Sequence, residues 1–100
     1  MEKKIKISKE AKKNTQRIIS YLTNEWSEAV ADKFIQRLEN KLNYISLFPN
    51  SYPSFDKFNN VRKCVLSKQI SLYYKIKNEE IEVLTLFDTR QDPDKLSSLL

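Results

Sequence analysis

The sequence of 100 residues contains no glycine, no histidine and a single cysteine. Without glycine, the chain cannot form the Gly-rich loops that bring backbone amides close to a phosphate in Walker-type and Rossmann-type sites. Without histidine, it lacks the usual zinc and iron ligand sets and cannot transfer protons through an imidazole. We therefore expect no metal and no cofactor, and any chemistry must use Lys, Arg, Tyr, Asp, Glu, Ser or Cys64.

Long apolar runs are also missing. The longest apolar stretches span a few residues, far fewer than the roughly 20 that a transmembrane helix needs. No apolar segment typical of a secretion signal follows the first residues, and the lone Cys64 permits no internal disulfide. These features predict a cytoplasmic protein that forms one domain over residues 1–100 and has no membrane partner.

Basic residues are in excess and unevenly placed. The chain has 18 lysines and arginines against 13 aspartates and glutamates, a net charge of +5. Residues 1–20 hold seven basic and two acidic residues, and residues 57–77 hold six basic residues and no acidic one. Such zones attract nucleic acid or an acidic protein. The alternative is a solvated lysine-rich surface, which suits residues 57–77 less well because their charges lie in strand-like sequence.

The first half of the chain predicts a strand and two helices. Ile5 and Ile7 alternate with lysines, as in a short half-exposed strand. Ser8 is the predicted N-cap of an amphipathic helix from Lys9 to about Asn24, and Ser27 that of a second helix. The apolar residues of the second helix recur at steps of four, four, four and three, at Val30, Phe34, Leu38, Leu42 and Ile45.

Pro49 should end the second helix near Phe48, because proline disfavours a helical conformation in the residue before it. The two helices then form an αα-hairpin, and Trp26 is expected to pack where the hairpin turns. Residues 48–60 contain two prolines and several aromatic residues. They are predicted to form a loop that packs its own rings.

The second half predicts an antiparallel meander of three strands at residues 61–66, 70–77 and 80–87. In the middle strand Ile70, Leu72, Tyr74 and Ile76 are expected to face the core, and Ser71, Tyr73, Lys75 and Lys77 the other side. Asp92 and Pro93 favour a short C-terminal helix. The fold class is therefore α+β, with the helices on one face of a small sheet that the meander completes.

In this order, these elements resemble the RelE/ParE superfamily of bacterial type II toxin–antitoxin toxins over nearly the whole chain. The resemblance rests on the order and spacing of several segments rather than on any single one. These segments are Trp26 followed by residues 29–34, Leu47-Phe48-Pro49, Tyr52-Pro53, Asn60-Val61-Arg62, Leu72-Tyr73-Tyr74-Lys75-Ile76, and Leu86-Phe87-Asp88-Thr89-Arg90-Gln91-Asp92-Pro93.

The resemblance implies a growth-arresting toxin that a small antitoxin neutralises. An acidic, amphipathic antitoxin segment that folds on binding would suit the basic charge and the apolar hairpin. We expect it to contact Trp26, Phe34 and Leu38. The superfamily contains two mechanisms, since ParE-like members block DNA gyrase and RelE-like members cut messenger RNA within the ribosome, and the fold alone does not choose between them.

A RelE-like nuclease would need a base, a cation for the charged phosphorane and an acid for the leaving oxygen. The family pattern has two basic residues two apart in the first meander strand, but here Arg62 is followed by Cys64. The early arginine of the next strand is replaced by the neutral Ser71, and no tyrosine or histidine follows Arg90. Only Arg62 and Arg90 fit, with Tyr73 as a substitute acid or base-stacking ring.

The ParE-like mechanism depends less on individual side chains, because binding to a protein target requires a surface rather than a set of catalytic groups. The resemblance therefore favours the gyrase reading, in which the chain is not an enzyme, over the nuclease. A third alternative is a non-toxic basic module that binds nucleic acid. In any of these readings the residues expected at the target or nucleic acid are Arg62, Lys63, Lys68, Lys75 and Arg90. The competing interpretations are that Arg62 and Lys63 are exposed strand cations and that Arg90 forms a structural ion pair.

Overall fold

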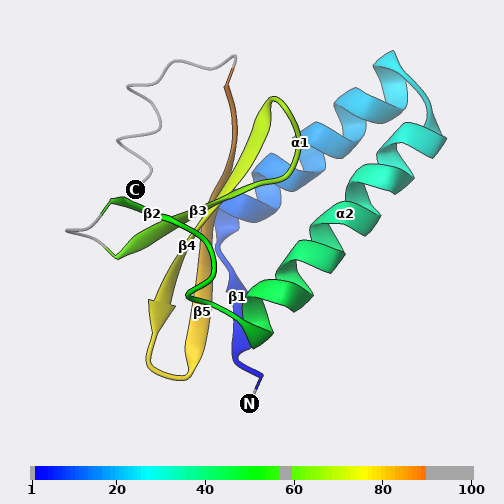
Figure 1. Ribbon diagram of the computed structural model, residues 1–100. Coiled ribbons are helices and arrows are strands. Elements are labelled where there is room, and N and C mark those ends of the chain that lie inside the picture. The colour runs from blue at the N-terminus through cyan, green and yellow to red at the C-terminus, as the bar shows by residue number, and fades with distance from the viewer. Residues whose placement is uncertain (1, 57–59, 90–100) are drawn as a thin grey trace.

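The computed structural model describes residues 2–56 and 60–89, which form two helices packed on a five-stranded sheet (Figure 1). The elements are β1 (Lys4–Ile7), α1 (Lys9–Glu25), α2 (Glu28–Leu47), β2 (Ser54–Asp56), β3 (Val61–Val65), β4 (Ile70–Lys77) and β5 (Glu80–Asp88). The strand order is β1-β5-β4-β3-β2, with β1 parallel to β5 and the other pairs antiparallel. The predicted α+β fold is confirmed, and the helix predicted from Asp92 lies outside the described residues.

Serine caps start both helices, as the sequence predicts. The Ser8 hydroxyl accepts a hydrogen bond from the Ala11 amide at 3.0 Å, and the Ser27 hydroxyl accepts one from the Val30 amide at 3.1 Å. Each bond satisfies one of the amides that a helix leaves unpaired at its N-terminus. Helix α2 ends at Leu47, one residue before the predicted Phe48.

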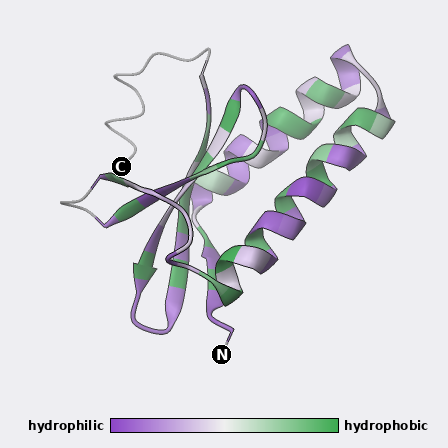
Figure 2. Ribbon diagram, in the orientation of Figure 1, coloured by the Kyte–Doolittle hydropathy of each residue, from purple (hydrophilic) through white to green (hydrophobic). Residues whose placement is uncertain are grey.

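The core lies between the inner sides of the helices and one face of the sheet. Hydrophobic and hydrophilic residues alternate along both helices in Figure 2, the amphipathic pattern of a helix with one covered side. A single cluster joins Ala11 of α1 and Phe34 and Ile45 of α2 to the strands, through Cys64, Leu66, Ile70, Leu72, Tyr74, Ile81, Val83 and Leu86. The predicted core side of β4 is thereby confirmed.

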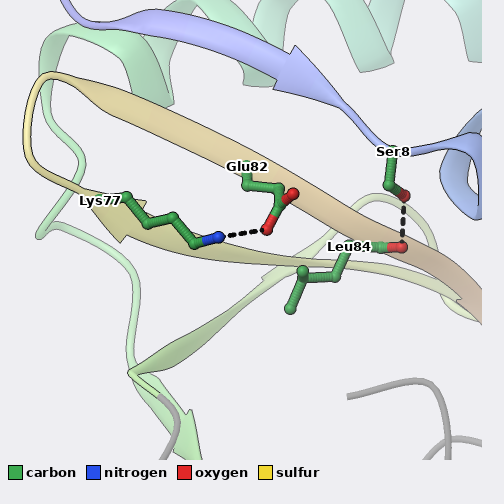
Figure 3. Close-up of polar contacts among 4 residues, drawn as sticks. All are labelled: Ser8, Lys77, Glu82 and Leu84. Atoms are coloured by element: carbon green, nitrogen blue, oxygen red, sulfur yellow. Dashed lines mark hydrogen bonds and ion pairs between the residues drawn. The ribbon is translucent and has the colours of Figure 1, made fainter.

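A bulge in β5 changes which of its residues face the helices. Tyr73 is paired with Thr85 and Tyr74 with Val83, so Leu84 has no partner in β4. As a result Val83 and Leu86 both join the helix-facing core, while Leu84 packs on the opposite face. The Ser8 hydroxyl donates a hydrogen bond to the carbonyl of Leu84 at 2.8 Å (Figure 3), which pairs a backbone group at the point where a bulge disrupts the ladder.

The loop predicted over residues 48–60 contains a strand that the sequence pattern does not reveal. Ser54–Asp56 form β2, which pairs with β3 at the edge of the sheet. Its three residues are too few for an alternating pattern to be recognised. Asparagine takes the positions where tight turns demand a left-handed backbone, with φ of 56° at Asn60 and 47° at Asn78. Asparagine adopts this conformation more readily than other non-glycine residues.

Candidate functional site

A groove lies between the helical hairpin and the end of the sheet at the β3–β4 turn. Its volume is about 720 Å³. We call it the hairpin groove. Its lining residues come from both helices, from the β3–β4 turn and from the C-terminal end of β5. They are Asn14, Arg17, Ile18, Tyr21, Leu22, Trp26, Val30, Lys33, Phe34, Arg37, Ser67, Gln69, Ile70, Leu86 and Asp88.

The hairpin groove exists because the apolar stripes of the helices continue past the sheet. Helix α1 has 17 residues and α2 has 20, so at 1.5 Å per residue each is about 25–30 Å long. Near the turn of the hairpin, Tyr21 is 43% exposed and Val30 37% exposed. These side chains follow the helical period of the core residues but remain partly exposed, as expected of a site that a partner covers.

The expectation that Trp26 packs where the hairpin turns is wrong. Trp26 is 70% exposed, because it is the C-cap residue that follows α1 and none of the described strands extends to this end of the hairpin (Figure 1). It nevertheless lines the hairpin groove together with Phe34, whereas Leu38 packs against the core and is not among the lining residues. The structure therefore brings two of the three predicted antitoxin contacts to the groove. Tyr21 and Val30 were missed, since helical periodicity does not reveal which part of a stripe stays uncovered.

Three cations line the hairpin groove beside its apolar floor. Arg17 comes from α1, and Lys33 and Arg37 come from α2. Arg37 is anchored, because its guanidinium donates a hydrogen bond to the carbonyl of Leu66 at 3.1 Å. The one acidic lining residue is Asp88. An apolar floor edged mostly by cations suits an amphipathic segment with acidic residues along its sides.

Arg62 is bound to the protein itself rather than aimed at a ligand. It pairs with Tyr74 in the sheet, on the helix-facing side. Its guanidinium donates hydrogen bonds to the carbonyls of Tyr52 at 2.5 Å and Asn50 at 3.3 Å. Charge-assisted bonds of this kind stabilise more than neutral ones. The position therefore gives Arg62 a structural role, which is to hold the loop after α2 on the sheet.

Tyr74 holds the same loop from the next strand. Its side chain is fully buried, and its hydroxyl donates a hydrogen bond to the carbonyl of Pro49 at 2.6 Å. Burial raises the pKa of Tyr74 to about 12, with Arg62 acting in the opposite direction.

This raised pKa predicts a loss of stability in alkali. The full contribution of Tyr74 is present below its unfolded pKa of about 10 and is lost as the pH rises through about 12. Two pKa units correspond to about 3 kcal/mol in the free energy of unfolding. We expect urea midpoints to fall between pH 10 and pH 12 in the wild type and to fall less in Tyr74→Phe. An equal decline in both proteins would contradict this origin.

Tyr73 lies on the opposite face of the sheet from Arg62. It packs with Val61 and Phe87 and is 3% exposed, so it faces away from the main core as predicted but is buried rather than open. The ring of Phe55 covers it edge-on, with the centroids 4.9 Å apart. Burial raises the pKa of Tyr73, so its hydroxyl stays protonated at neutral pH.

Two predicted cations share this face with Tyr73. Lys63 is the register partner of Tyr73 in β3, and its ammonium group lies 6.0 Å from the centroid of the Phe55 ring. Lys75 follows two residues later in β4 and is half-buried. Lys68 stands apart, exposed in the β3–β4 turn. Arg90 lies outside the described residues. Of the three residues predicted for a nuclease, Arg62, Tyr73 and Arg90, the two that the structure describes thus lie on opposite faces of the sheet.

Residues 2–56 and 60–89 hold no group of three side chains that could bind a metal ion. Neither of the helices described is long and apolar enough to cross a lipid bilayer.

Comparisons with known proteins agree on the architecture. A chain of the chromosomal ParDE toxin–antitoxin system from P. aeruginosa superposes with a TM-score of 0.72 at 16% identity, covering 86% of this chain and 95% of that one. The conserved hypothetical protein HP0894 from Helicobacter pylori matches with a TM-score of 0.56 at 21% identity, covering 89% and 97%. No curated protein sequence is significantly similar to this chain.

The family model of the ParE toxin, the toxin of the type II toxin–antitoxin system parDE, matches residues 5–93. This range includes both helices, β2 to β5, all of β1 except Lys4, and every lining residue of the hairpin groove. The protein therefore belongs to the ParE family of type II toxin–antitoxin toxins.

Proposed function

We propose that this toxin arrests growth by inhibiting DNA gyrase and that an antitoxin neutralises it by occupying the hairpin groove. The observation that favours gyrase over messenger RNA as the target is the separation of Arg62 from Tyr73. Metal-free RNA cleavage requires a cation and an acid around one phosphate, whereas Arg62 is engaged by loop carbonyls on the face opposite to Tyr73. Inhibition of a protein target needs no such group of side chains.

The hairpin groove supports the antitoxin half of the proposal. A related ParDE system pairs a toxin with an antitoxin, and the groove offers the apolar floor and the cations that an acidic amphipathic helix would recognise. Such a helix would bury the exposed parts of Tyr21, Trp26 and Val30. The free energy gained by burying these side chains would offset the conformational entropy that a disordered antitoxin segment loses when it folds on the toxin.

The cations of the groove predict a salt-dependent complex. Three ion pairs at about 0.5 kcal/mol each give about 1.5 kcal/mol, or roughly tenfold in affinity, and salt screens them. We expect the dissociation constant to rise about tenfold between 0.1 M and 1 M salt. The double variant Arg17→Gln, Lys33→Gln should flatten this slope. Lys12→Gln, exposed on α1 outside the groove, should not, and an affinity indifferent to salt would refute the charge argument.

Two assays on the isolated toxin test the choice of target. One measures supercoiling and DNA cleavage by purified gyrase, and the other measures cut message in translating ribosomes. We expect gyrase to lose supercoiling activity in proportion to added toxin, with message left intact. Message cut within ribosomes while gyrase works normally would overturn the proposal.

One observation favours the RelE-like alternative. Lys63, Tyr73 and Lys75 lie on one face of the sheet, and a protonated tyrosine between two lysines could donate to a leaving oxygen. Against it, Phe55 covers the ring of Tyr73, and the side chain is 3% exposed. A message would have to displace Phe55 before it could reach the hydroxyl.

A further inference from the structure

A second hollow, separate from the hairpin groove, lies between the C-terminal half of α2 and the loop that follows. Its volume is about 400 Å³, and its lining residues are Asn40, Lys41, Tyr44, Ser51 and Tyr52. None of them lines the hairpin groove. We call it the aromatic hollow, and neither the antitoxin proposal nor the gyrase proposal uses it.

Exposed rings border the aromatic hollow. Tyr44 is 46% exposed and Phe48 54% exposed, and their ring centroids lie 5.1 Å apart at an interplanar angle of 45°. Tyr44 also meets the ring of Tyr52 nearly edge-on, at 5.9 Å. Large rings left this open contribute little to the core. Their outer faces are available to a flat ligand that can stack on them.

The polar groups of the hollow are cationic or neutral. Lys41 places its ammonium group 5.9 Å from the centroid of the Tyr52 ring. Within the described ranges it forms no ion pair, and the amide of Asn40 has no hydrogen-bond partner there. Ser51 donates its hydroxyl proton to the carbonyl of Phe48 and keeps its oxygen as an acceptor. No lining residue is acidic, so the hollow favours an anionic ligand with hydrogen-bonding edges.

Hydrogen bonds from the sheet hold the loop side of the hollow in place. Arg62 binds the carbonyls of Asn50 and Tyr52, and Tyr74 binds that of Pro49. The pKa of Tyr52 is raised to about 12, mainly by burial and further by the neighbouring Cys64. A ligand would therefore meet a preformed surface and lose less free energy in ordering it.

We propose that the aromatic hollow binds single-stranded nucleic acid. One or two bases would stack on Tyr44 and Phe48, with Asn40 at a base edge and Lys41 at a phosphate. Stacking rings combined with an unpaired cation are the usual elements of sites for single strands, and they tolerate any sequence because every base has a flat face. A peptide would use the rings but would gain less from Lys41 and from the free amide.

The test measures the fluorescence anisotropy of a labelled twelve-residue oligothymidylate with toxin made by cell-free synthesis. We expect Tyr44→Ala and Phe48→Ala each to weaken binding between about fivefold and 100-fold, the usual effect of losing one stacked base. Tyr44→Phe should retain affinity, because it keeps the ring. A duplex of equal length should bind more weakly than the single strand, because its bases are already stacked.

Matched variants separate this site from diffuse attraction by a basic protein. Tyr21→Ala removes a tyrosine of similar exposure, 43%, from the hairpin groove, and Lys12→Gln removes one charge from the open side of α1. Neither should weaken binding as Tyr44→Ala or Lys41→Gln does. Equal losses in Lys12→Gln and Lys41→Gln, with no loss in Tyr44→Ala, would overturn the proposal.

Two further results would also decide it. If Tyr44→Ala weakens the complex with the antitoxin but leaves oligonucleotide binding unchanged, the hollow is a protein-docking surface and the proposal is wrong. Gyrase inhibition is measured on the same variants. If it persists while oligonucleotide binding is lost, the hollow is shown to act independently of the proposed target, and the failure of one proposal leaves the other standing.

Discussion

Replacing Trp26 with alanine is expected to weaken antitoxin binding about 100-fold while leaving the stability of the toxin nearly unchanged. Trp26 is 70% exposed at the mouth of the hairpin groove, so the free toxin gains little from it. A partner that buries the ring removes roughly 100 Å² or more of apolar surface from water, worth about 2.5 kcal/mol or more at 25 cal/mol per Å². Buried tryptophans of this kind are typical binding hot spots.

Calorimetric titration of the toxin variants with the antitoxin measures this change. Leu47→Ala is the matched control, because Leu47 is 53% exposed at the other end of the hairpin and does not line the groove. It should leave the affinity within about twofold of the wild type. If Trp26→Ala binds as tightly as Leu47→Ala, the antitoxin does not occupy this part of the groove.

Asn14→Ala is expected to lower the free energy of unfolding by about 3 kcal/mol. The side-chain oxygen of Asn14 accepts hydrogen bonds from the Thr85 hydroxyl at 2.7 Å and the Leu86 amide at 3.1 Å, both buried. These bonds join α1 to β5 just past the bulge. Alanine would leave both donors without a partner, at about 1–3 kcal/mol for each group.

Thermal unfolding followed by circular dichroism would detect this loss as a fall in Tm of roughly 10–20 °C for a domain of this size. Asn24→Ala is the control, because Asn24 is an exposed asparagine near the end of the same helix. It should change Tm by only a few degrees. Similar losses in the two variants would show that the bonds of Asn14 add nothing specific to the fold.

Local patterns were enough to predict both helices and four of the five described strands, but not β2. The caps at Ser8 and Ser27, the proline stop after α2 and the alternation in β4 each depend on a few neighbouring residues. The turn between β4 and β5 was also predicted at the right residues. It forms without glycine because Asn78 adopts the required positive φ. Propensity and periodicity act at this range, so one sequence can reveal them.

The candidate site depended on contacts between distant segments and was predicted less well. The sequence placed Arg62 and Tyr73 in one potential catalytic group, but strand pairing sets them on opposite faces. It predicted that Trp26 packs where the hairpin turns, since nothing in the sequence shows that the sheet ends before the helices do. The bulge at Leu84 depends on how β5 meets β4 and β1, and alternation within β5 could not reveal it.

The most direct test of the proposed function compares wild-type toxin with Tyr73→Phe in the gyrase and ribosome assays together. The variant keeps the buried ring and its contact with Phe55 and removes only the hydroxyl on which an RNA-cleaving mechanism would depend. We predict that both proteins inhibit gyrase supercoiling at the same concentration and that neither cuts message. Message cut by the wild type and spared by Tyr73→Phe, with gyrase unaffected by either, would contradict the account.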